Sequence, residues 1–339
     1  MTYIKDLKDS KWVWYGVTTL IFGVLIYFAD VNKFIESLTS ADPLYFLVAL
    51  IFGLSFFISN AIIWHSFLRE IEISVSFWKS LKLFMAGNFM NSVTPLGNLG
   101  GEPFMAYIIS RNTEANYQQS ISSIVSADLV NTIPFITYSA GGIVYLFLFG
   151  SIPNVIMRAT YFTVALILVG GTIAYLLWFK EDLLENFILS LLERIENKLG
   201  ERKYFRAAEE KIEETINVFQ KYGDNPRHLA KTSIVGHVSV VTQIICLYFV
   251  LLSLGVEPEI VPITLTVILS GLAAFTPTPG GSGTIEAAFS GLLMLFLPIA
   301  FDMALAAAFL FRMTTYLPGI PLGYLALINL QKGMKEKKK

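Results

Sequence analysis

The sequence TPTPGGSG, residues 276–283, interrupts a long apolar stretch of the chain, and Glu286 follows it three residues later. A related sequence, TPLGNLGGEP, occupies residues 94–103 in the first half and carries Glu102 directly after its Gly-Gly pair. Helices broken at matching places in two halves of a membrane protein are typical of transporters that bind substrate near the bilayer midplane. The paired loops therefore predict a transporter-like protein.

The composition is that of a membrane protein. The 339 residues are 54% hydrophobic and only 15% charged, whereas soluble domains carry about 25% charged residues. Six apolar runs reach, or nearly reach, the roughly 20 residues that a spanning helix needs. They are Trp12–Ala29, Leu44–Trp64, Ser120–Phe149, Tyr161–Phe179, Ile234–Leu254 and Met303–Leu330. We therefore predict an all-α, polytopic integral membrane protein with about six spanning helices.

Cysteine and histidine are too scarce for disulfide or metal chemistry. The single cysteine, Cys246, can form neither an intrachain disulfide nor a cysteine-based metal site, and the three histidines show no ligand spacing. We therefore expect no metal and no cofactor. The formal net charge of −1 gives no reason to expect a nucleic-acid partner.

Lysine and arginine concentrate in four segments: the N-terminus, residues 65–82, residues 180–231 and the C-terminal tail. Cytoplasmic loops of membrane proteins carry such an excess. The segments 30–43, 150–157 and 255–260 contain one lysine between them and are expected outside. The distribution predicts a multi-pass protein of the cell (cytoplasmic) membrane with both termini in the cytoplasm.

The segments beside each loop are too short to cross a bilayer. Val261–Thr276 and Thr284–Leu297 would measure roughly 24 and 21 Å as helices, against a hydrocarbon core of roughly 30 Å. Leu83–Val93 and Pro103–Ser110 are shorter still. We expect each pair to form a re-entrant hairpin, the first entering from the cytoplasm and the second from outside.

These elements predict a single transmembrane domain, residues 1–339, built as an inverted repeat. Repeat one would cover about 44–149 and repeat two about 229–330. A connector at about 180–228, with amphipathic cytoplasmic helices, would join them. Residues 331–339 would form a basic tail.

Glu102 and Glu286 are the first candidates for substrate binding or coupling, because ionisable residues inside a membrane are costly and usually functional. The helix N-termini after the loops offer free N–H groups that suit a phosphate or carboxylate. Alternatively, both glutamates cap these helices, with Pro103 as the first helical residue. Arg312 lies deep in the last apolar run, where pairing with Glu286 or Glu102, or binding of a lipid phosphate, is favoured over snorkelling.

Further candidates surround the loops. Asp128 is followed by Asn131 and Pro134, which fits either a polar kink lining a cavity or a hydrogen bond between helices. Asn91 is expected near the first loop. Arg111 is either an interface anchor at the hairpin exit or part of the site. The loop glycines complete the candidate set: Gly100, Gly101, Gly280 and Gly281.

Several of these motifs together resemble the flippase-like family typified by the lysylphosphatidylglycerol synthase transmembrane region, which includes the flippase half of multiple peptide resistance factors. The matching residues are Pro95 with Gly100-Gly101-Glu102, Arg111, Asp128, Pro279-Gly280-Gly281-Ser282-Gly283 with Glu286, and Arg312 before Pro318. The resemblance covers roughly residues 10–330. It implies a stand-alone lipid flippase that lacks the soluble transferase domain and its synthase activity.

The leading hypothesis is a transporter, not an enzyme, that moves an anionic phospholipid or a polyprenyl-phosphate-linked lipid across the membrane. The sequence contains no metal-ligand cluster, nucleophile–base pair or phosphate-loop motif. Three alternatives stay open: a membrane-embedded enzyme acting on a lipid with two glutamates as acid and base, a small-solute channel, and an accessory partner of a lipid glycosyltransferase. A lipid-synthesis partner and a homo-oligomer are also compatible with the sequence.

Overall fold

The computed structural model describes residues 30–94, 101–149, 214–276 and 278–336, with isolated positions between residues 16 and 27 and between 168 and 190. The described part of the chain is helical and contains no strand, which confirms the all-α class. The predicted spans Trp12–Ala29 and Tyr161–Phe179 lie largely outside the described residues, as does most of the connector.

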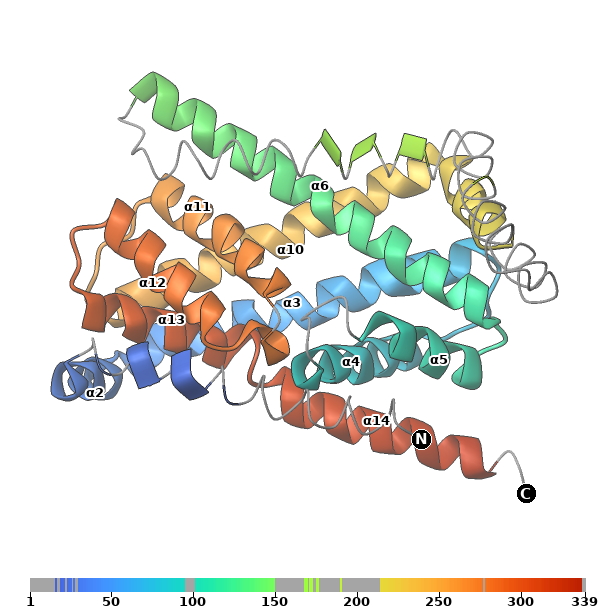
Figure 1. Ribbon diagram of the computed structural model, residues 1–339, viewed down its shortest axis with the longest axis horizontal. Helices are drawn as coiled ribbons and strands as arrows, with labels where there is room; N and C mark the ends of the chain where they lie inside the picture. Colours follow the sequence, from blue (N-terminus) through green and yellow to red (C-terminus); the bar gives the residue numbers. More distant parts are fainter. Residues whose placement is uncertain are drawn as a thin grey trace.

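Three long helices run almost the whole length of the molecule: α3 (Pro43–Glu70), α6 (Tyr117–Phe149) and α10 (Pro226–Ser253) (Figure 1). Two of them begin at a capping side chain followed by proline, which suits the first turn because its missing N–H has no helical partner there. Asp42 accepts from the backbone N–H of Leu44 at 2.8 Å before α3. The Asn225 side chain accepts from the backbone N–H of His228 before α10.

Two helical hairpins lie between these long helices. The first consists of α4 (Phe77–Val93) and α5 (Glu102–Asn112). The second consists of α11 (Ile260–Ser270) and α12 (Thr284–Phe296), joined through the short 3₁₀ turns η2 (Gly271–Phe275) and η3 (Pro279–Gly281). In Figure 1 the hairpins extend from opposite ends of the molecule, and η3 packs against α4 where they meet near the middle.

The last apolar run is broken, although the sequence suggests one span over Met303–Leu330. The structure instead has α13 (Phe301–Thr315) and α14 (Gly319–Glu336). Pro318 lacks an N–H and disfavours helical backbone at the residue before it, which explains the break. Counting α13 and α14 as one path, four helices in the described part of the chain are long and apolar enough to cross a membrane.

The break lets α14 lie against α4 of the first hairpin (Figure 1). Two glycines four residues apart make this contact close, as small residues do between membrane helices. A Cβ at Gly319 would lie 2.6 Å from Asn88 Nδ2, and a Cβ at Gly323 would overlap the carbonyl oxygen of Met85. The second half of the last run is therefore attached to the first hairpin.

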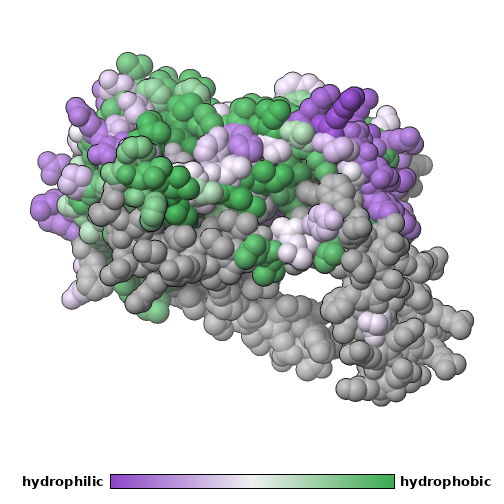
Figure 2. All heavy atoms as spheres, turned by 90° about the horizontal axis from the view of Figure 1, so that it is seen from above, coloured by the Kyte–Doolittle hydropathy of each residue, from purple (hydrophilic) through white to green (hydrophobic). Residues whose placement is uncertain are grey.

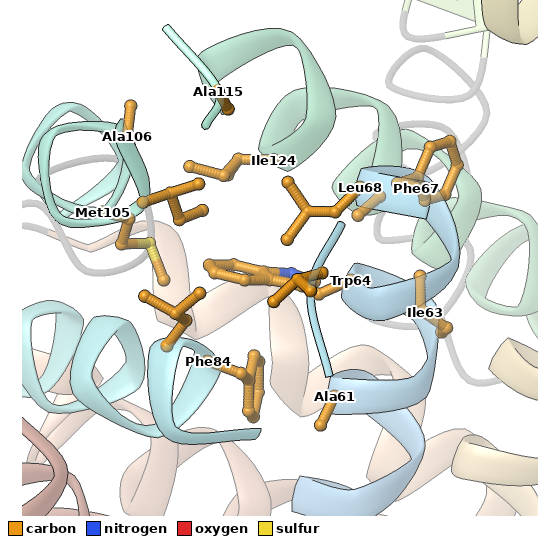
Figure 3. Packing of buried hydrophobic residues seen from close by; sticks show 14 of the residues in the cluster. Ala61, Ile63, Trp64, Phe67, Leu68, Phe84, Met105, Ala106, Ala115 and Ile124 are labelled. Carbon is orange, nitrogen blue, oxygen red and sulfur yellow. The ribbon is translucent and has the colours of Figure 1, made fainter. Parts of the chain in front are cut away.

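A hydrophobic core joins α3, α4, α5 and α6 at the end where the first hairpin enters (Figure 3). Trp64 lies at its centre with 4% of its surface exposed. Its ring meets Phe84 edge to face, with the centroids 5.3 Å apart, a preferred aromatic geometry. This core fixes the base of the first hairpin.

On the face that Figure 2 shows, the described hydrophobic residues gather in the middle and the hydrophilic ones gather toward the two ends. The end with α2 (Val31–Ser40) and the start of α3 carries Asp30, Lys33, Glu36, Asp42, Glu257, Glu259 and Asp302. The opposite end carries the basic residues Arg69, Lys79, Lys82, Arg111, Arg227, Lys231 and Lys332, besides acidic ones. The helices thus bring most described basic residues to one end of the molecule.

Candidate functional site

The second loop depends on glycine. Gly280, Gly281 and Gly283 have φ angles of 58°, 65° and 85°, in the left-handed region that residues with a Cβ rarely adopt. Threonine hydroxyls hold the two sides of the loop together: Thr276 Oγ1 and Thr284 Oγ1 are 2.6 Å apart. The loop is therefore a tightly turned, internally bonded connection between η2 and α12.

Arg312, from α13, and Glu286, from the first turn of α12, form a buried ion pair. Arg312 Nε donates to Glu286 Oε1 at 2.9 Å, and the two residues are 8% and 5% exposed. The other carboxylate oxygen, Oε2, accepts from the backbone N–H of Gly283 at 2.7 Å. Glu286 therefore caps α12 and neutralises Arg312 at the same time.

Arg312 also binds the loop itself. Its Nη2 donates to the carbonyl oxygen of Gly280 at 3.1 Å. A guanidinium has five N–H groups, and the bonds to Glu286 and Gly280 use two of them. Within the described residues this leaves three N–H groups for another acceptor.

Tyr316 covers one face of this guanidinium. The Cζ atom of Arg312 lies 3.5 Å from the centroid of the tyrosine ring. A Cβ at Gly280 would overlap the tyrosine hydroxyl, so ring and loop are in direct contact. The sequence interpretation missed Tyr316. Its position four residues after Arg312, on the same face of a helix, was the available signal.

The first loop is described only from Gly101 onward, so the candidate Gly100 lies outside the described residues. Gly101 is needed for a close approach, because a Cβ there would overlap Asn91 Oδ1 from α4. That buried oxygen has no hydrogen-bond partner among the described residues. Glu102 follows as the first residue of α5, so Pro103 occupies the second helical position instead of the expected first.

Glu102 and Asp128 bring two carboxylates to the space beside the first loop. Glu102 begins α5, and Asp128 lies on α6, the helix that packs against α5. Asp128 is exposed, as is Thr132 one turn later on α6. An exposed polar side chain in the middle of a spanning helix requires a wet opening or protein partners. We interpret this part of α6 as the wall of an opening beside the first loop.

Asn131 has a different role from its neighbour Asp128. Its Nδ2 donates to Asn60 Oδ1 of α3 at 3.1 Å, and Asn60 Nδ2 approaches Ser239 Oγ of α10 at 3.4 Å. This polar contact ties three long helices together, as hydrogen bonds between membrane helices do. Asn131 therefore follows the helix-linking alternative, whereas Asp128 faces the opening.

Arg111 is not brought to either loop. It lies in the last turn of α5, is exposed, and stacks over the ring of Tyr107 with Cζ 5.4 Å from its centroid. A cation in the last turn also complements the helix dipole. This geometry fits an anchor at the membrane interface.

The contacts connect the two loops through α4. η3 packs against α4, the same helix that places Asn91 beside Gly101 and Asn88 beside Gly319. Among the described residues, no group of three or more His, Cys, Asp or Glu side chains could hold a metal ion. The structure thus gathers Glu286, Arg312, Gly280 and Gly281 at one loop, and Asn91, Gly101, Glu102 and Asp128 at the other.

Known proteins resemble this chain over most of its length. The family model of the lysylphosphatidylglycerol synthase TM region matches residues 13–323. A UPF0104 membrane protein of Pyrococcus horikoshii is 25% identical over 307 residues, covering 86% of this chain and 88% of the relative. One from Methanocaldococcus jannaschii is 22% identical over 334 residues, covering 95% of each chain. The chain therefore belongs to the family of the lysylphosphatidylglycerol synthase TM region.

Proposed function

We propose that the protein is a lipid flippase that moves an anionic phospholipid or a polyprenyl-phosphate-linked lipid across the cell membrane. The observation that carries the proposal is the meeting of two opposed helical hairpins near the middle of the molecule, with the buried Arg312–Glu286 pair at one loop. Broken helices at this depth are a device that transporters use to hold polar substrate groups within the bilayer.

A lipid suits this architecture better than a small hydrophilic solute. On the face that Figure 2 shows, the described surface between the two polar ends is largely apolar. The opening that we infer beside the first loop is lined by two exposed polar side chains, Asp128 and Thr132. A headgroup could occupy the polar opening while its acyl or prenyl chain stays among apolar side chains. The charges at the site favour a headgroup with a phosphate, since arginine binds phosphate in a bidentate manner.

The charges at the two ends of the molecule suggest its orientation in the membrane. The end that collects Arg69, Lys79 and Lys82 would face the cytoplasm by the positive-inside rule. The first hairpin would then enter from the cytoplasm, the second from outside, and both chain termini would be cytoplasmic. We further propose that the two halves form an inverted repeat and that the protein catalyses no reaction itself.

The test is a headgroup-accessibility assay in proteoliposomes with fluorescent phosphatidylglycerol, fluorescent phosphatidylcholine and a short polyprenyl phosphate. We expect wild-type protein to move at least one of the two anionic lipids. Arg312→Ala should slow that movement at least tenfold, because a hydrogen bond to a charged group contributes about 1.5–3 kcal/mol. Arg227→Ala, which removes an exposed arginine far from the loops, is the matched control and should keep the wild-type rate.

Two outcomes would contradict the proposal. Folded wild-type protein that moves none of the three lipids would exclude a flippase for these classes. Conversion of any lipid into a new product would favour a membrane-embedded enzyme. Cysteine labelling at Lys79→Cys and Glu257→Cys tests the orientation, since the native Cys246 is buried. The two sites should be labelled from opposite sides of the membrane.

A further inference from the structure

We propose that Tyr316 is a positioning residue that orients Arg312 to receive the phosphate of a lipid headgroup. The inference rests on the proposed function and goes beyond it by naming the recognised group, a phosphate ester, and the residue that aligns its receptor. Tyr316 would act through Arg312 and need not contact the lipid.

The contacts around Arg312 fix its guanidinium from three directions. Glu286 holds Nε at 2.9 Å, and the carbonyl oxygen of Gly280 holds Nη2 at 3.1 Å. The Tyr316 ring lies across one face, with its centroid 3.5 Å from Cζ. Such a contact sets the plane of the guanidinium, and a cation over an aromatic ring gains about 2 kcal/mol where water is excluded.

The remaining N–H groups are then arranged for a planar, two-point acceptor. Two of the five guanidinium N–H groups are engaged by Glu286 and Gly280. A phosphate that accepts from the other groups must approach in the plane of the guanidinium, because arginine binds phosphate through parallel N–H donors. A ring that holds the plane reduces the ordering cost of binding.

The backbone at Tyr316 explains how the ring is held. Tyr316 follows the last residue of α13, and its N–H still donates to the carbonyl oxygen of Arg312 at 3.0 Å. Its own carbonyl oxygen accepts from the N–H of Gly319 at 3.0 Å, across the break before α14. The ring is thus attached to the break between the two helices and touches the second loop at Gly280.

The experiment measures binding of dioctanoyl phosphatidylglycerol to detergent-purified protein by titration calorimetry. Dioctanoylglycerol serves as a ligand without phosphate. Tyr316→Phe keeps the aromatic face and should bind phosphatidylglycerol within twofold of wild type. Tyr316→Leu should weaken that binding about tenfold and leave dioctanoylglycerol binding unchanged. Tyr324→Leu, which removes an exposed tyrosine on α14 that packs on Phe89, is the matched control and should bind as wild type.

A second variant separates positioning from general loss of structure. Arg312→Lys keeps the positive charge but cannot stack or bind in a fork, and should weaken phosphatidylglycerol binding to a similar extent. The double variant, Tyr316→Leu with Arg312→Lys, should bind phosphatidylglycerol no more than about threefold more weakly than either single variant. Both substitutions disrupt the same oriented guanidinium, so their effects should not add. If Tyr316→Leu does not fold, Tyr316→Met removes the ring and replaces it with an unbranched side chain that adapts to the space more easily.

Several results would overturn the inference. The first two are Tyr316→Leu protein that binds phosphatidylglycerol within twofold of wild type, and Tyr316→Leu protein that loses affinity equally for phosphatidylglycerol and dioctanoylglycerol. The others are a double variant in which the two losses of affinity add, and wild-type protein that does not bind phosphatidylglycerol. Transport is not part of this readout. Wild-type protein that binds phosphatidylglycerol but moves no lipid would contradict the proposed flippase activity. The binding data alone would then decide the role of Tyr316.

Discussion

Gly280→Ala tests the geometry of the second loop most directly. The φ angle of Gly280 is 58°, where an L-residue with a Cβ loses roughly 1–2 kcal/mol. The new Cβ would also overlap the Tyr316 hydroxyl and lie 2.8 Å from its Cζ. Overpacking of this kind typically adds about 1–3 kcal/mol. We expect the free energy of unfolding to fall by about 2–5 kcal/mol in total.

Thermal unfolding in one detergent, followed by tryptophan fluorescence, measures the effect. For a chain of this size the loss corresponds to a fall in Tm of roughly 3–7 °C. Gly291→Ala is the matched control. Gly291 lies inside α12, and no other atom would come within 4 Å of its new Cβ. Alanine is the better helix former there by up to about 1 kcal/mol, so this variant should be at least as stable as wild type.

A second substitution separates the two causes of destabilisation. Tyr316→Phe removes the hydroxyl that meets the new Cβ but leaves Cζ at 2.8 Å. In the Gly280→Ala background it should restore part of the lost stability, whereas the cost of the φ angle should remain. The reasoning is refuted if Gly280→Ala unfolds at the wild-type temperature, or if Tyr316→Phe gives no recovery while Gly291→Ala behaves as expected.

Two further predictions concern buried polar groups. Arg312→Met should lower stability by about 3–5 kcal/mol because it leaves the buried carboxylate of Glu286 unpaired. Adding Glu286→Gln should recover part of the loss. Thermal unfolding of the wild type, the single variant and the double variant tests this, and a double variant that is the least stable of the three would disprove it. Tyr222 is fully buried, and its hydroxyl lies 2.7 Å from Ser123 Oγ of α6. Burial raises the pKa of Tyr222, so the folded state keeps the phenol proton to higher pH than the unfolded state does, and this contribution to stability is lost as pH rises above about 10. Tyr222→Phe should be about 1 kcal/mol less stable at pH 7 and should show a shallower loss between pH 9 and 11, a result that equal slopes for both proteins would contradict.

The hairpins could be predicted from sequence because their signals are local. Proline and glycine mark both loops, and the apolar segments beside them are countable. The break between α13 and α14 has a local signal as well, in Pro318 and Gly319. The hydrophobic run from Met303 to Leu330 continues across this break, however, and so predicts a single span. Hydropathy gives the length of a run and does not report where its backbone turns.

The partner of Arg312 could not be chosen from sequence alone. Glu102 and Glu286 are both acidic, both follow a Gly-Gly pair, and both lie in the first turn of a helix. The choice depends on which hairpin packs beside α13, and that is set by the tertiary arrangement. Tyr316 was missed for a related reason, since an aromatic residue in an apolar run is usually part of the core.

The buried Arg312–Glu286 pair is not needed for the stability of the second loop, and a role in binding accounts for it better. Removing two charges from water costs several kcal/mol for each ion, and apolar residues of similar volume are often as stable. The cap on α12 needs an acceptor for the Gly283 N–H, and a neutral glutamine would supply one. Neither requirement calls for Arg312. A guanidinium that is buried beside a loop, stacked on Tyr316 and left with three unused N–H groups within the described residues fits the phosphate receptor that we propose.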